Sequence, residues 1–145
     1  MPQTLRGNSN QAGLRFISNT ITFTGATGLG EIGTVPIFTV TGEVLVAVLS
    51  AFCTTLLGGA TATLALGVTG STSLFIAATT ATDIDANEFW NDTAPDANGI
   101  AVPAAMKDIQ ITDNIIGTVA TANLTSGVMR FDLYYMPLSS DGNVA

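Results

Sequence analysis

The longest apolar stretch of the chain runs from Val35 to Val68. It is rich in β-branched residues and contains a single carboxylate, Glu43, and a single thiol, Cys53. The glycine pair Gly58-Gly59 interrupts it. Because β-branched residues favour strands and glycine pairs favour turns, the pattern predicts buried β-strands at the centre of the molecule rather than a helix.

Alternation of apolar and polar residues predicts further strands on either side of this stretch. The clearest is Val128 to Met136, because Met129, Phe131, Leu133 and Tyr135 fall on one face. Turn signals recur about every 8 to 12 residues, which is typical of a sandwich or barrel. In chain order, the expected strands cover residues 15–24, 34–41, 44–52, 60–68, 74–80, 107–112, 115–121 and 128–136. The prediction is an all-β fold, a jelly-roll-like sandwich or small barrel of about eight antiparallel strands.

For two of these strands, the sequence also predicts where in a sheet they lie. The strand over residues 44–52 is apolar on both faces, which predicts a middle strand covered on both sides. Pro36 lacks a backbone N–H, so the strand that contains it is expected at a sheet edge or at a bulge.

The chain has 145 residues and a mass of 14.8 kDa, enough for one domain with its own core. Residues 1–13 are polar and are expected to form an extended N-terminal arm, followed by a single all-β domain over 14–137 and a polar tail over 138–145. Arg6 and Arg15 are the only cations before Lys107. The arm is either a frayed terminus or a segment that docks on an acidic neighbouring subunit, which makes both arginines candidate contacts with a capsid or subunit.

Charge narrows the possible partners. Four Lys and Arg residues against eleven Asp and Glu residues give a net charge of −7, which argues against binding to a phosphate backbone. Charged residues make up 10% of the chain, against about 25% in an average domain. A surface of Thr, Ser, Asn and Gly suits close subunit contacts, because few charges must be desolvated there. We therefore expect a homo-oligomer, although a secreted adhesin could share this composition.

Neither a membrane span nor a secretory signal is expected. The most apolar segment, Val44 to Leu57, is shorter than the ~20 residues that cross a bilayer. The N-terminal sequence MPQTLRGNSNQAGLR has no apolar core of the signal-peptide kind. We expect a protein that is cytosolic when it is made and has no membrane partner.

The residue types leave little room for catalysis. The chain has no histidine, which excludes Ser-His-Asp and Cys-His arrangements. Cys53 lies in an apolar run and is expected to be a small buried hydrophobe. Asp83 and Asp85, if on a strand, would point the same way about 7 Å apart, a separation that inverting glycosidases use. Any D-x-D strand gives this geometry, so we expect no enzyme and no cofactor.

The same acidic segment begins like a calcium loop, with Asp83, Asp85 and Asn87 at the first, third and fifth positions. It departs from the EF-hand at the sixth position, where Glu88 replaces the required Gly, and at the twelfth, where Ala94 replaces the bidentate Glu. A looser calcium site made by Asp83, Asp85, Glu88 and Asp92 is a weak candidate, and a solvated acidic loop is the favoured interpretation.

One longer set of segments resembles a known group of proteins. These segments are ITFTGATGLGEIGTVPIFTVTGEVLV, GGATATLALGV, TTATDIDANEFW and the closing YYMPLSSDGNV. They resemble small structural proteins of tailed bacteriophages over residues 17 to 143. The resemblance carries no catalytic signature and therefore no functional residues to transfer. It implies a virion component, and a short all-β chain with a polar arm is similar in kind to capsid decoration (cement) proteins, which commonly form trimers on the head.

The expected function is therefore that of a capsid decoration protein that binds the major capsid protein as a homo-oligomer, with a trimer favoured. Strands that are apolar on both faces fit a trimer whose core continues between subunits. One alternative is a tail, neck or fibre-associated subunit. Another is a carbohydrate- or receptor-binding module, for which the candidate aromatic residues are Phe89, Trp90, Tyr134 and Tyr135.

Overall fold

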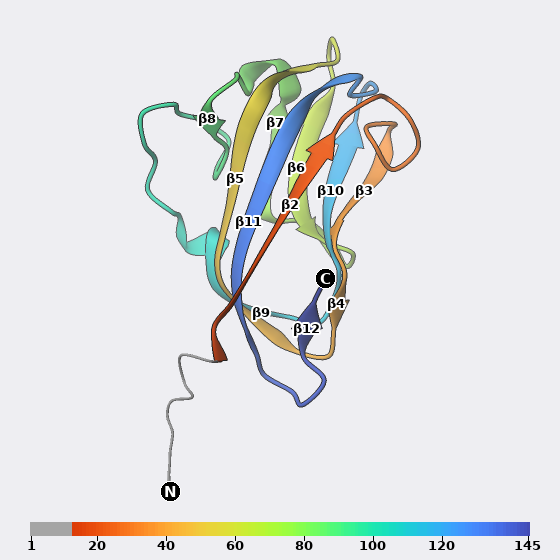
Figure 1. Cartoon of the computed structure of the whole chain (residues 1–145). Helices are drawn as coiled ribbons and strands as arrows, with labels where there is room; N and C mark the ends of the chain where they lie inside the picture. Colours follow the sequence, from red (N-terminus) through yellow and green to blue (C-terminus); the bar gives the residue numbers. More distant parts are fainter. Residues whose placement is uncertain (1–12) are drawn as a thin grey trace, which may run out of the picture.

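The computed structural model describes residues 13–145 and consists of β-sheets joined by short turns and loops. The two main sheets face each other and enclose one hydrophobic core (Figure 1). All strand pairs are antiparallel. The predicted all-β sandwich is confirmed, with about ten strands rather than eight, and the sheets do not close into a barrel.

The five-stranded sheet is built around β5 (Val44–Gly58), the longest strand. Strand β11 (Ser126–Pro137) pairs with one side of β5, and β2 (Arg15–Thr22) pairs with the far side of β11. The other side of β5 pairs with two short strands, β8 (Glu88–Phe89) and β9 (Lys107–Ile111). Strand β5 is therefore a central strand, as its apolar sequence predicts.

The four-stranded sheet has the order β3-β10-β6-β7. Strands β6 (Thr63–Val68) and β7 (Ser71–Thr80) form the predicted hairpin. Strand β10 (Ile115–Ala120) enters between β6 and β3 (Gly33–Phe38). Among the described residues, β3 pairs only with β10, and the register shifts opposite Pro36, so this proline lies both on an edge strand and at an irregularity.

Alternation along β11 directs one face into the core. Met129, Phe131, Leu133 and Tyr135 are all buried, as predicted. Strand β5 differs from the prediction, because only one of its faces is fully buried. On the other face Leu45, Val48, Phe52 and neighbouring residues remain partly exposed. These side chains are only partly covered within one chain, so the expected full cover on both sides was wrong.

The smaller elements close the ends of the sandwich. They are β4 (Val40–Thr41), β12 (Asn143–Val144) and the 3-10 helices η1 (Ala81–Asp83) and η2 (Ala104–Met106). Within the described part of the chain, no helix is long and apolar enough to cross a membrane.

The segment 138–145 does more than form a polar tail. Strand β12 pairs with β4, and the Val144 side chain is buried in the core. The backbone N–H and C=O groups of Ala145 both bond to Thr39. The last residues are therefore part of the fold.

Candidate functional site

The acidic segment does not form the strand that would place Asp83 and Asp85 side by side. Asp83 ends the helix η1, and Asp85 lies in the irregular segment that follows, with the fully buried Ile84 between them. The geometric premise for a strand-borne carboxylate pair was therefore wrong. The chain forms a 3-10 turn that ends at Asp83 and is closed by the hydrogen bond from the Ile84 N–H to the Ala81 carbonyl oxygen, so Asp83 is not part of a strand.

Two carboxylates of this segment accept hydrogen bonds from backbone N–H groups of their own loop. Glu88 Oε2 accepts the N–H of Asp85 at 2.8 Å, and Asp92 Oδ1 accepts the N–H of Ala94 at 2.7 Å. Across residues 13–145, no three His, Cys, Asp or Glu side chains come together as a metal site would require. The calcium site of Asp83, Asp85, Glu88 and Asp92 stays an untested prediction.

Cys53 faces the core from β5 and is buried, as predicted. Its Sγ donates to the carbonyl oxygen of Thr55 at 3.2 Å. Burial raises the pKa of the Cys53 thiol to about 11, and the negative charges of Glu88 and Asp85 act in the same direction. The group is therefore a neutral thiol at physiological pH, unlike a reactive cysteine.

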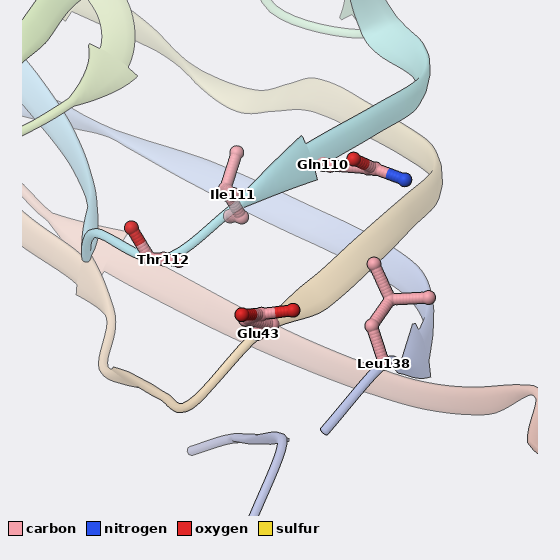
Figure 2. Close-up of a pocket in the computed structure, with 5 residues that line it drawn as sticks. All are labelled: Glu43, Gln110, Ile111, Thr112 and Leu138. Carbon is pink, nitrogen blue, oxygen red and sulfur yellow. The ribbon is translucent and has the colours of Figure 1, made fainter.

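A hollow of about 320 Å³ lies at one end of the five-stranded sheet (Figure 2). It is lined by Glu43, Gln110, Ile111, Thr112 and Leu138, which come from the start of β5, the end of β9 and the segment after β11. Its polar groups are one carboxylate, one amide and one hydroxyl, with no histidine, thiol or cation among them. This set can bind a polar or cationic group but lacks a nucleophile paired with a base.

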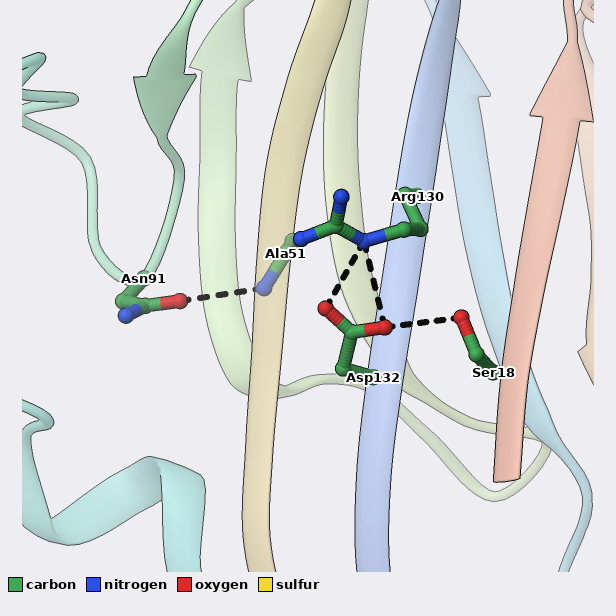
Figure 3. A network of polar contacts seen from close by, with 5 residues as sticks. All are labelled: Ser18, Ala51, Asn91, Arg130 and Asp132. Atoms are coloured by element: carbon green, nitrogen blue, oxygen red, sulfur yellow. Dashed lines mark hydrogen bonds and ion pairs between the residues drawn. The ribbon is translucent and has the colours of Figure 1, made fainter. Parts of the chain in front are cut away.

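A polar network lies on the outer face of the five-stranded sheet (Figure 3). Arg130 Nε donates to Asp132 Oδ2 at 2.9 Å, and Ser18 Oγ donates to Asp132 Oδ1 at 2.7 Å. The Arg130 guanidinium also lies 5.2 Å from the ring centroid of Phe52, which packs edge-on against Phe89. The network joins β2, β11, β5 and β8 across one surface.

The structure separates the four aromatic candidates for glycan binding. Trp90 is fully buried, and its Nε1 donates to Thr79 Oγ1 at 3.0 Å. Tyr135 is buried as well, whereas Phe89 is partly buried and Tyr134 is 46% exposed. The four side chains do not form one exposed platform, which a stacked sugar ring would need.

The two arginine candidates lie at the same end of the chain. Arg6 lies outside the described residues. Arg15 is the first residue of β2 and is exposed, opposite Tyr135 of β11. The structure thus places one of the two predicted subunit contacts on the edge strand of the five-stranded sheet.

An apolar surface on this sheet was missed by the sequence reasoning. Five of the eight exposed large apolar side chains found in residues 13–145 belong to the sheet end where the chain enters and where β11 ends. We call this surface the outer patch. Its members are Leu14, Phe16, Tyr134, Met136 and Leu138. The sequence signal was the apolar character of the alternate positions 134, 136 and 138, opposite in phase to the buried face of β11.

Comparison with known proteins gives a fold likeness. No family model and no curated protein matches the chain. Among solved structures, a chain of the cyanophage Pam1 capsid asymmetric unit matches with a TM-score of 0.53 and 17% sequence identity. The match covers 86% of this chain and 85% of the cyanophage chain, so it spans the whole sandwich rather than a single motif. At this identity the likeness shows a shared fold.

Proposed function

We propose that this chain is a structural protein of a bacteriophage virion, and specifically a capsid decoration protein. In this role it binds the major capsid protein on the head surface and stabilises the shell. The protein acts as a homo-oligomer, with a trimer favoured, and has no enzymatic activity. It is made in the host cytoplasm and ends in the virion.

The observation that carries the proposal is the fold likeness to a chain of a cyanophage capsid asymmetric unit, over 86% of this chain. The sequence resemblance to structural proteins of tailed phages points the same way and rests on different information.

The surface supports the same role. Where the chain is described, acids outnumber cations and only one ion pair forms, so charge does little to fix the fold. Small neutral polar groups and exposed apolar side chains dominate instead. Such a surface can be buried against neighbouring subunits at a low desolvation cost, and many weak contacts add up on a repetitive shell.

The test uses purified full-length protein and expanded, empty capsids of the phage that encodes it. We expect the protein to sediment with the capsids at a regular ratio to the major capsid protein and to raise the temperature at which they break. Immunogold labelling of intact virions should mark the head.

Label on the tail or neck would contradict the decoration role and indicate a tail-associated subunit. Absence of the protein from purified virions, together with binding to host cells or glycans, would overturn it in favour of a receptor-binding module.

A further inference from the structure

The outer patch lies on β2 and β11 and adjoins partly exposed apolar residues of β5. Tyr134 of β11 lies opposite Phe16 of β2 on one side and Val48 of β5 on the other, and the Phe16 and Tyr134 ring centroids are 4.9 Å apart. In the next outward-facing row, Met136 lies opposite Leu45. Two adjacent rows of the sheet therefore present apolar side chains to solvent.

The size of the patch fits a protein partner. The exposed fractions of its five side chains run from 36% for Met136 to 54% for Phe16. Side chains of this size and exposure leave on the order of 500 Å² of apolar surface in water, near the largest patch of an ordinary monomer. A stable protein interface buries about 800 Å² on each partner. The patch can supply the apolar centre of such an interface.

The rim of the patch carries both signs of charge. Lys107 of β9 lies opposite Val48, beside the Phe16–Tyr134 row. Glu43 lies beside Leu138 in the hollow of Figure 2. Neither Lys107 nor Glu43 forms an ion pair with another residue of the described chain. A partner that supplies one carboxylate and one ammonium group at its own rim would match both.

We propose that a second copy of this chain packs against the outer patch. A second copy supplies an equal apolar area and the same two rim charges. It can approach a chain of net charge −7 here because two of the four cations of the chain lie beside patch residues, Arg15 next to Phe16 on β2 and Lys107 in the Phe16–Tyr134 row. The chain's own residues 1–12 are a poor cover, because Met1 and Leu5 are their only large apolar side chains. This inference rests on the proposed homo-oligomer and assigns it a surface.

The test measures the native mass of the full chain by light scattering at about 1 to 100 µM. Over this range a weak oligomer dissociates on dilution, whereas a tight one keeps its mass. We expect the parent to have a multiple of the 14.8 kDa chain mass. The double substitution Phe16→Lys and Tyr134→Lys should reduce it to the mass of one chain. The matched control, Ile32→Lys with Leu56→Lys, changes two equally exposed apolar residues outside the patch and should keep the parent mass.

Circular dichroism shows whether each variant keeps the β fold. If the patch variant does not fold, the single substitution Met136→Lys tests the patch in its place. The parent by itself still tests association, because an oligomer that dissociates on unfolding has a melting temperature that rises with protein concentration. A parent of 14.8 kDa at every concentration, or a folded patch variant that keeps the parent mass, would overturn the proposal. Equal dissociation of the control would also overturn it.

The failure of this inference can be told apart from failure of the proposed function. A monomeric parent that still sediments with capsids would remove the second copy and leave the decoration role in place. An oligomer that the patch substitutions disperse, but that never binds capsids, would support the interface and remove the decoration role.

Discussion

The two sheets of the sandwich differ in the residues that they offer to solvent. The strands of the four-stranded sheet, β3, β6, β7 and β10, contain no charged side chain, and their polar side chains are the neutral hydroxyls of Ser and Thr. The five-stranded sheet carries Arg15, Glu88, Lys107, Asp108, Arg130 and Asp132. Their inner faces are alike, because both contribute fully buried apolar side chains to one core.

This difference allows the contribution of core packing to stability to be compared with that of surface charges. If the uncharged sheet is as stable as the charged one, burial and close packing provide the stability, and the charges serve recognition. Substitutions that touch the shared core or the tight hairpin should then cost far more than those that remove charges.

The largest expected effect is at Trp90, which joins the sheets. Its backbone N–H bonds to Ala51 of β5, and its indole N–H bonds to Thr79 of β7. Trp90→Ala should lower the free energy of unfolding by about 3–5 kcal/mol, because it leaves a large cavity in the core. Urea unfolding measures this loss. Trp90→Phe, which keeps most of the apolar volume, should cost clearly less, and equal losses for the two variants would contradict the account.

The next effect contrasts one glycine in each sheet. A methyl group at Gly67 of β6 would meet the backbone of Ser71 and Thr72, whereas one at Gly58 of β5 would meet the rotatable Ser126 hydroxyl. Gly67→Ala should therefore destabilise the protein by roughly 1–3 kcal/mol, as overpacking does, and Gly58→Ala by less than about 1 kcal/mol. Chemical denaturation of the two variants side by side checks the ranking. The reverse order would show that the backbone of the β6–β7 hairpin shifts to accommodate the added methyl group.

A smaller, pH-dependent effect belongs to Cys53 on the inner face of the charged sheet. Its pKa is about 11 in the folded protein against 9.0 for an unburied thiol, so folding favours the protonated form. Between these values the unfolded chain loses its proton first, and stability must fall as the pH rises. The loss should be about 1.5 kcal/mol between about pH 9 and 10.5. Comparison with Cys53→Ala isolates this group, because an identical pH slope in both proteins would contradict the assignment.

The smallest effect is expected at the Arg130–Asp132 pair, the ion pair of the outer face. The two side chains are 42% and 24% exposed, so water and salt screen their attraction. A double-mutant cycle with Arg130→Met and Asp132→Asn should give a coupling of about 0.2–1 kcal/mol that shrinks in 1 M salt. A coupling well above this range would mean that the charges stabilise the five-stranded sheet after all.

Local pattern predicted the strands with strong alternation. The buried set of β11 and the hairpin of β6 and β7 follow from alternation and turn residues close in the sequence. The place of β10 between β3 and β6 does not, because it depends on pairing between distant segments. Pro36 indicated an edge because its chemistry constrains its neighbours directly.

The surface features were harder to predict, because exposure depends on what other segments cover. The apolar sequence of β5 indicated burial on both faces, yet its outer side chains remain partly exposed. Tyr134 was recognised as a candidate surface aromatic, but its partner Phe16 emerges only from the register between β11 and β2. For the acidic segment, the D-x-D spacing allowed a strand, but the chain forms the 3-10 turn Ala81–Asp83, which is closed by a local hydrogen bond that the spacing does not reveal.

The position of β5 in the chain has a consequence for how the protein is made. All of its sheet neighbours, β8, β9 and β11, come later in the sequence, and β11 is the last long strand. During synthesis, the edge of this uncharged strand that pairs with β11 therefore stays open until nearly the whole chain has left the ribosome. Distant pairings of this kind fold slowly, and an open apolar edge favours aggregation in the meantime. Slow synthesis or a chain that stops before Ser126 would thus expose the segment most able to form insoluble β-aggregates.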